Sequence, residues 1–284
     1  MMSVRPCVLQ RNKAPMRYVQ SLPMPKPRIL AILNLLGWAG VLAVNTLANT
    51  LPINGYNTGQ ISAFYPNLFV PAGFTFAIWS VIYLLMTGFT ATSVRWLWHR
   101  PDDPVGRLAT AVSPLFLLSC LLNAGWILLW HHLQTGLSVL VMLAFLAVLL
   151  RTYLVLQPYR DRLRGARRIF LYQFFIVYLG WISVATIANI TAWLVSLSWD
   201  GFGLPPASYS IALIVIAIAL GGFFTLGRRD AAYGSVIAWA LFGIYASQGT
   251  ANPSIGWTAR AGYTLLLALV AYSLFRKPSD RQPA

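Results

Sequence analysis

Amide and aromatic side chains recur on one helical face in each of four long apolar stretches of the sequence. Residues three, four or seven positions apart lie on the same side of a helix. We expect such a face to point toward protein or a ligand, because an amide faces lipid only at high cost. The candidate binding residues are Asn45 and Asn49 near residues 29–50, Thr75, Trp79 and Tyr83 near 71–94, Asn123 and Trp126 near 113–130, and Tyr178, Trp181 and Asn189 near 169–195.

The side chains needed for covalent or proton-transfer chemistry do not accompany them. The chain has no glutamate, and its six aspartates lie in expected loops or tails. No lysine or arginine lies deep in an apolar stretch, whereas ion-coupled transporters mark their path with such groups. The sequence has no nucleophile beside a base, no carboxylate pair and no spacing of metal ligands. We therefore expect no catalytic residue, no metal and no required cofactor.

Two adjacent histidines and two cysteines need separate interpretation. His131 and His132 could hold a metal or a haem, but no third ligand is nearby, and such a pair more often forms a turn at the membrane interface. Cys7 lies in a polar tail and Cys120 inside an apolar stretch, so we expect no disulfide.

Membrane-spanning helices are the elements that must position the candidate residues. Of the 284 residues, 58% are hydrophobic and 10% are charged, against about 25% charged in globular domains. Backbone groups in hydrocarbon must pair internally, so an apolar stretch of about 20 residues is expected to be a helix. The sequence predicts an all-α integral membrane protein with eight spans, near residues 29–50, 71–94, 113–130, 134–156, 169–195, 207–227, 231–248 and 258–275.

Basic residues fall almost wholly on one side of these spans. Of the 21 lysines and arginines, all except Arg260 lie in the tails and connections of that side. This positive-inside pattern predicts cytoplasmic termini in a multi-pass protein of the plasma or inner membrane, and it explains the net charge of +15 without a nucleic-acid partner. Residues 1–28 and 277–284 are expected to be cytoplasmic tails, and Met16 and Met24 are alternative starts to Met1.

The expected helix directions place the amide and aromatic groups at a similar depth, toward the outer side. Above that level lies the loop 51–70, which has no charged residue. This loop either folds back over the bundle or lies in the lipid interface. A mostly apolar cavity with a few convergent polar groups is the usual form of a small-molecule site. Hydrogen bonding between helices is the alternative role for the asparagines of the first span.

Several of these stretches also carry motifs of a known family. The matching residues are Pro71, Gly73, Phe76, Trp79, Tyr83 and Met86 in the second span, Leu122, Asn123 and Trp126 in the third, and Tyr178, Trp181, Ala185 and Asn189 in the fifth. In these residues the chain resembles the tryptophan-rich sensory protein family (TspO/MBR), which includes the mitochondrial translocator protein. The resemblance covers residues from about 29 to 195. Ala72 and Val177 depart from it, since the family has proline at both places.

The resemblance implies a five-helix bundle over residues 29–195, to which residues 196–276 add three further helices. It also implies a flat hydrophobic ligand, either porphyrin or haem-related or sterol-like, bound for sensing, transport or regulation. Trp79, Trp126 and Trp181 would stack on such a ligand. The asparagine amides would hydrogen-bond its polar edge or fix helix positions.

Two other functions remain open at this stage. The protein could be an uncoupled small-molecule transporter or channel that uses all eight helices, or an intramembrane enzyme that modifies a porphyrin. Its expected partners are a hydrophobic small molecule and membrane lipid. The three extra helices could cover the site or replace a dimer contact, which leaves a homodimer open.

Overall fold

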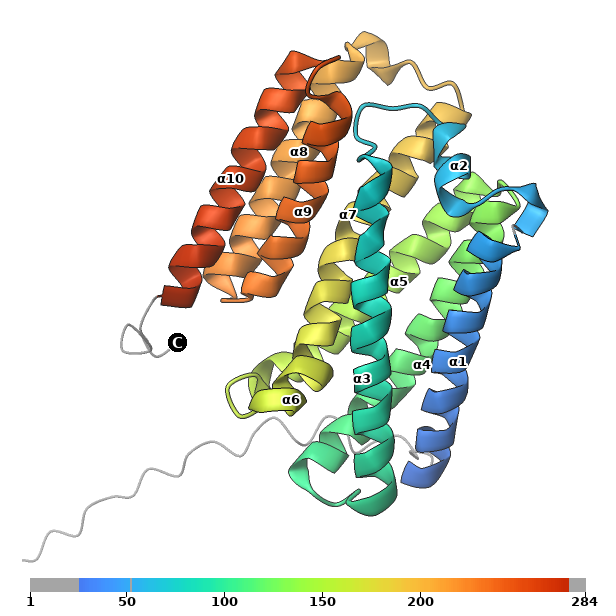
Figure 1. Ribbon diagram of the computed structural model, residues 1–284, viewed down its shortest axis with the longest axis vertical. Coiled ribbons are helices and arrows are strands. Elements are labelled where there is room, and N and C mark those ends of the chain that lie inside the picture. Colours follow the sequence, from blue (N-terminus) through green and yellow to red (C-terminus); the bar gives the residue numbers. More distant parts are fainter. Residues whose placement is uncertain (1–25, 52, 276–284) are drawn as a thin grey trace, which may run out of the picture.

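The computed structural model describes residues 26–51 and 53–275, which form a helical bundle without strands (Figure 1). The long helices are α1 (Pro27–Thr50), α3 (Ile78–His99), α4 (Pro104–His131), α5 (Thr135–Leu156), α7 (Phe174–Ser196), α8 (Pro206–Gly222), α9 (Ala231–Gln248) and α10 (Pro253–Phe275). The short segments are α2 (Thr58–Ala63), α6 (Gly165–Arg168), the 3-10 helices η2 (Ile53–Gly55), η3 (Gly73–Ala77), η4 (Gln157–Tyr159) and η6 (Gly201–Gly203), and the π-helices η5 (Ile169–Gln173) and η7 (Phe223–Gly227). The predicted tails at residues 1–25 and 276–284 lie outside the described residues.

Prolines mark where several of the long helices begin. Pro27, Pro104, Pro206 and Pro253 are each the first residue of a helix, where the missing N–H costs no intrahelical hydrogen bond. Asp103 caps α4, because its carboxylate accepts the backbone N–H of Val105 at 2.8 Å.

Seven segments of the described chain are long and apolar enough to cross a membrane, and they contain α1, α3, α4, α5, α7, α8 and α10. They confirm the all-α, multi-pass class and match seven of the eight predicted spans. The eighth predicted span, 231–248, forms α9, which is not among the seven. Its 18 residues include two tyrosines, a tryptophan, two serines and a glutamine. It nevertheless runs alongside α8 and α10 for its whole length (Figure 1).

The long helices alternate in direction, which sorts the connections between the two ends of the bundle. The connections around residues 95–107, 157–168 and 228–229 lie at the lower ends of their helices in Figure 1, on the side here called the basic end. Residues 51–72 lie at the opposite end, here called the loop end. Arg260, in the second turn of α10, lies toward the loop end.

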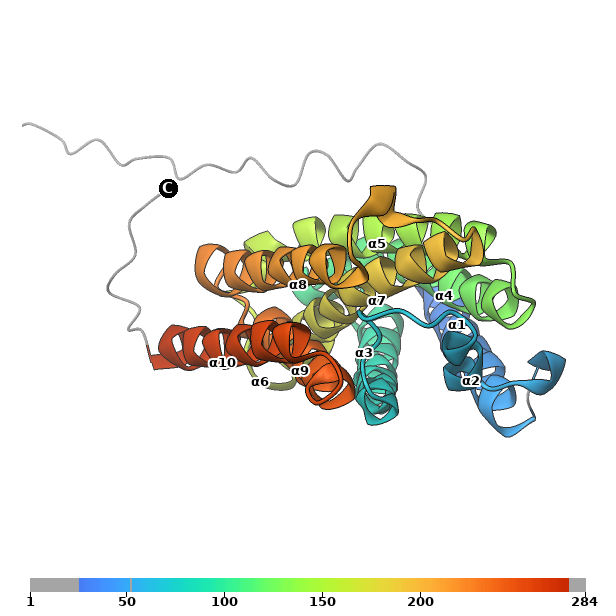
Figure 2. The ribbon, with the colours of Figure 1, turned by 90° about the horizontal axis from the view of Figure 1, so that it is seen from above.

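The helices pack as two neighbouring groups (Figures 1 and 2). Helices α1, α3, α4, α5 and α7 form the first group, and α8, α9 and α10 lie beside α7 as the second. Most of the contact between the groups is made by α9 against α7. Gly180 of α7 permits the approach, since a Cβ added there would lie 3.2 Å from Cβ of Val236.

A second contact of α9 secures the segment that leads into α3. The backbone N–H of Ala72 donates to the Gly243 carbonyl at 2.9 Å, and the indole N–H of Trp239 donates to the Thr75 carbonyl at 2.9 Å. Gly243 lies so close to η3 that an added Cβ would be 2.0 Å from Oγ1 of Thr75 and 2.9 Å from Cβ of Pro71. The start of α3 is therefore built against the second group of helices.

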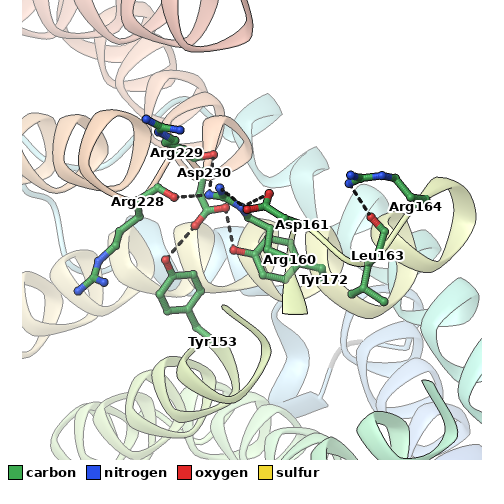
Figure 3. Close-up of polar contacts among 9 residues, drawn as sticks. All are labelled: Tyr153, Arg160, Asp161, Leu163, Arg164, Tyr172, Arg228, Arg229 and Asp230. Atoms are coloured by element: carbon green, nitrogen blue, oxygen red, sulfur yellow. Dashed lines mark hydrogen bonds and ion pairs between the residues drawn. The ribbon is translucent and has the colours of Figure 1, made fainter. Parts of the chain in front are cut away.

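Asp230 joins the two groups at the basic end (Figure 3). Its carboxylate accepts hydrogen bonds from the hydroxyl of Tyr153 in α5 at 2.9 Å and of Tyr172 in η5 at 2.8 Å. Only 2% of Asp230 is exposed. Burial raises the pKa of its carboxyl, although the two phenol hydroxyls and the Arg160 guanidinium oppose the rise.

Arg160 completes this junction from the connection between α5 and α6. Its guanidinium donates to the backbone carbonyls of Arg228 and Arg229, and it pairs with Asp161 (Figure 3). Both π-helical segments flank the site: Tyr172 belongs to η5, and the Asp230 N–H donates to the Phe224 carbonyl of η7 at 2.9 Å. The π-turns thus coincide with the place where the two helix groups are hydrogen-bonded together.

Gly243→Ala is expected to destabilise the protein, because the new methyl group would overlap Thr75. Thr75 is fully buried and β-branched, so its side chain has little room to move away. Overpacking of this kind costs about 1–3 kcal/mol, so the midpoint of unfolding in detergent should fall. Gly40→Ala is the matched control, because no atom lies within 4 Å of a Cβ added there. Equal midpoints for the two variants would contradict the close packing of η3 on α9.

Candidate functional site

A pocket opens at the loop end, between the start of α3, the end of α4 and the loop-end half of α7. Its free volume is about 60 Å³, below the range of about 300–1,000 Å³ typical of small-molecule sites, so a ligand of that size needs the lining to move. Its lining is mostly apolar and includes four tryptophans, namely Trp79, Trp126, Trp130 and Trp181.

Three of these tryptophans form a stack along one wall. The Trp79 and Trp126 rings are 6.3 Å apart with planes at 24°, and the Trp126 and Trp130 rings are 5.9 Å apart with planes at 18°. Trp181 stands almost perpendicular to Trp79, at 84°. The wall therefore presents parallel aromatic faces with one indole set across them.

Small side chains from α7 form another part of the lining. Ala185, Ala188 and Ala192 line the pocket together with Val184 and Asn189. The three alanines repeat at intervals of three and four residues, so they fall on one helical face. Because they are small, they leave the space that the tryptophans of α3 and α4 border.

Asn189 holds one of the stacked rings in place. Its side-chain oxygen accepts the indole N–H of Trp126 at 3.2 Å, and its amide nitrogen donates to the hydroxyl of Ser138 in α5 at 3.0 Å. The Asn189 amide thus donates a hydrogen bond to α5 through its N–H and accepts one from Trp126 through its carbonyl. The asparagine positions the aromatic wall from the neighbouring helix.

Residues 53–72, here called the lid, lie over the pocket. Thr58, Ser62, Asn67, Val70 and Pro71 of the lid line it. Within the lid, a capping box begins α2. The backbone N–H of Gln60 donates to the Asn57 side-chain oxygen, and the backbone N–H of Asn57 donates to the Gln60 side-chain oxygen, both at 2.9 Å. The loop therefore folds back over the bundle, which is one of the two positions that its uncharged sequence predicted.

His131, at the end of α4, anchors the lid. Its Nδ1 lies 3.1 Å from the Ile53 carbonyl and its Nε2 lies 3.1 Å from the Thr58 hydroxyl, while its own carbonyl accepts from Asn54 at 3.1 Å. A carbonyl only accepts, so Nδ1 carries the proton and Nε2 accepts from Thr58. Both ring nitrogens are thus engaged with the lid. The described residues contain no group of three or more metal-ligating side chains.

The structure brings four of the ten predicted residues into this pocket: Trp79, Trp126, Trp181 and Asn189. Three others form a hydrogen-bonded chain outside it. Asn45 donates to the Asn123 side-chain oxygen at 2.8 Å, and Asn123 donates to the Tyr178 hydroxyl at 2.9 Å. These three bonding partners come from α1, α4 and α7, so the chain joins three helices.

The remaining three predicted residues also lie outside the lining. Tyr83 stacks on Trp79 with ring centroids 5.6 Å apart, and so supports the aromatic wall from behind. Asn49 donates to the backbone carbonyl of Asn45 at 2.8 Å. Thr75 faces α9, against Gly243.

The lid residues and the alanines were not among the predicted binding residues. The spacing of Ala185, Ala188 and Ala192 is a signal that could have identified the small-residue wall. The lid offered no such signal, because Ile53, Asn54 and Thr58 meet His131 partly through backbone carbonyls, which any residue carries.

A bundle of apolar helices that encloses an aromatic pocket under a lid defines the class: this is a multi-pass α-helical membrane protein. Comparison with known families places it further, since the sequence model of the TSPO-like protein family matches residues 31–272. The chain belongs to this family. The match takes in α8, α9 and most of α10, and so extends beyond residues 29–195, over which the motifs were recognised. Comparisons with curated proteins and with solved structures give no match.

His131→Ala should loosen the lid without unfolding the bundle. The variant removes both ring contacts to residues 53–58, and each lost hydrogen bond of a buried group costs about 1–3 kcal/mol. Hydrogen exchange of residues 53–63 should therefore become faster, while that of α4 stays slow. His132→Ala is the matched control, because His132 is adjacent and exposed. Unchanged exchange in the lid of the His131 variant would contradict the anchoring role.

Proposed function

We propose that the protein binds a flat hydrophobic small molecule, of the porphyrin, haem-related or sterol-like kind, in the pocket at the loop end. The observation that carries this proposal is the parallel stack of Trp79, Trp126 and Trp130 along one wall. Offset stacking on aromatic faces is the contact that a planar apolar ring makes best. The alanines of α7 add small apolar side chains to the lining.

The buried indole N–H of Trp181 is a second feature that the ligand should match. Nε1 of Trp181 is buried and has no hydrogen-bond partner among the described residues, although its ring lines the pocket. Leaving such a group unpaired costs about 1–3 kcal/mol. A ligand with a carbonyl or carboxylate oxygen at its edge would satisfy this donor, which favours a planar ring system that carries polar substituents.

Ligand entry requires movement of the lid and of the rings. The lid covers the pocket, and the three stacked indoles already contact one another. A planar molecule therefore either inserts between two indoles or lies against the outer face of the stack. Opening of the lid before Pro71 supplies the path, and it would break the hydrogen bonds between His131 and the lid and the one from the Trp130 indole N–H to the Thr58 carbonyl.

Binding is better supported than passage through the bundle. Between the pocket and the basic end, Phe89 of α3 packs on Phe116 of α4 and on Phe174 and Phe175 of α7, with ring centroids 4.6, 5.6 and 5.0 Å apart respectively. This aromatic plug opposes a continuous channel. The pocket lining contains no acidic, basic, histidine or cysteine side chain, so we propose a sensory or regulatory binding protein rather than a porphyrin-modifying enzyme.

We also propose that the basic end faces the cytoplasm of the plasma or inner membrane. The support is the concentration of arginines in the connections of that end. Reporter fusions should give an outside location after residue 60 and an inside location after residue 284. The opposite result at either position would refute this orientation.

Protoporphyrin titration of the purified protein in detergent tests the binding proposal. Quenching of tryptophan fluorescence should saturate, and Trp181→Ala should weaken binding by about 1–3 kcal/mol, the order expected for loss of one buried aromatic contact. Trp199→Ala is the control, because Trp199 packs on Phe202 in the link to α8 and on Tyr209 of α8, outside the pocket. Equal losses in both variants would indicate general destabilisation, and no loss in the Trp181 variant would remove that residue from the site.

Formation of a coloured product on illumination or with an oxidant would favour the enzyme instead.

A further inference from the structure

A second cavity opens at the basic end, between the last turn of α3 and the beginning of the α6–η5 segment. It encloses about 1020 Å³, counted with its open mouth, and is lined by Arg95, Trp96, His99, Arg100 and Arg167. Arg167 comes from a part of the chain about 70 residues away, so the cavity exists only because η5 packs beside α3. It is separate from the pocket under the lid and does not depend on the function proposed there.

Two of its arginines share one indole ring. The guanidinium carbon of Arg167 lies 5.5 Å from the centre of the Trp96 ring, and that of Arg100 lies 5.8 Å from it. Cation–π contact with Trp96 orients both groups toward the cavity that all three residues line. Two like charges are thus held on the same aromatic side chain.

No carboxylate balances these charges. The lining contains no acidic residue, and within residues 26–51 and 53–275 the one ion pair joins Arg160 to Asp161. Asp103, which follows in the chain, uses its carboxylate to cap α4. Within the same described residues, the guanidinium groups of Arg95, Arg100 and Arg167 donate no hydrogen bond to a protein acceptor. The N–H groups of these three guanidinium groups are therefore available to donate hydrogen bonds to an anion from outside the chain.

The position of the cavity indicates where that anion comes from. The membrane-spanning segment that contains α3 ends at His99, so the cavity lies at the depth where the membrane meets water. Two turns of α3 further into the membrane, the ring of Phe170 of η5 fills the space beside Gly88, where an added Cβ would be 2.2 Å away. Next to the cavity, Trp98 and Ile169 are 44% and 46% exposed and offer apolar surface to an acyl chain.

We propose that this cavity binds a phosphate group, and that the phosphate belongs to the headgroup of an anionic membrane lipid. Guanidinium groups match phosphate oxygens with paired, charge-assisted hydrogen bonds. Basic pockets between helices at a membrane surface are suited to anionic headgroups. The lipid's phosphate would relieve the repulsion between Arg100 and Arg167 and bridge the end of α3 to α6, with its chains outside the bundle.

Lipid binding to the delipidated, full-length protein in neutral detergent provides the test. Dioleoyl phosphatidylglycerol is titrated while bound lipid is counted by native mass spectrometry, with dioleoyl phosphatidylcholine as the zwitterionic reference and glycerol phosphate as the soluble phosphate. The variant Arg95→Gln/Arg100→Gln/Arg167→Gln removes the site. Its control is Arg151→Gln/Arg162→Gln/Arg164→Gln, which removes the same charge near the same end, outside the cavity.

The proposal expects one tight phosphatidylglycerol per chain, weakened by at least about tenfold in the cavity variant and by less than about twofold in the control. Equal weakening in both variants would overturn it, because general surface charge would then explain binding. Equal affinity for the two lipids would also overturn it. Competition by glycerol phosphate at the same concentration as lipid would uphold the phosphate site and overturn the lipid source. If the triple variant does not fold, Arg167→Gln against Arg164→Gln gives the same comparison, with about a threefold loss expected.

Discussion

Buried amide groups impose the constraint on which this bundle depends. In an apolar bundle an asparagine without a partner is costly, and the partner must come from another helix or from the backbone. Asn45 of α1 therefore bonds to Asn123 of α4, and Asn123 bonds to Tyr178 of α7. Each bond is directional, so it fixes how far one helix can slide or turn against the next. Apolar contacts alone would permit many nearly equivalent registers, whereas these bonds select one.

The binding pocket follows from that selected register. Asn189 reaches from α7 to hold the Trp126 indole, and the same amide bonds to Ser138 of α5, so ring orientation and helix position are set together. The Trp126 ring is consequently tethered to α7. The lid is tied to the bundle through hydrogen bonds to His131 and through the indole N–H of Trp130, which donates to the Thr58 carbonyl at 3.3 Å. Opening of the lid would therefore release the Trp130 ring while Trp126 stays tethered.

The sequence allowed the helices and their polar faces to be predicted, because both follow from periodicity and from the length needed to cross a bilayer. It could not say which neighbour each face meets. Thr75 shares its face with Trp79, yet it packs on Gly243, more than 160 residues away, since η3 contacts α9 there. Asp230 was correctly placed in a loop, but its burial arises only where that loop meets Tyr153 and Tyr172. Such contacts between segments distant in the sequence have no periodic signature.

The composition of α9 has a consequence for its neighbours in the membrane. Its neighbours α8 and α10 belong to segments apolar enough to enter a bilayer by themselves, but α9 is not among the segments that meet that condition. Its surface is instead buried by α7, α8 and α10. We therefore expect the polar side chains of α9 to be shielded from lipid by its neighbours, above all by α10, with which it forms a hairpin through the short turn at residues 249–252. Substitutions on the α9-facing side of α10 would then expose α9 to lipid, and so would affect the stability of both helices together.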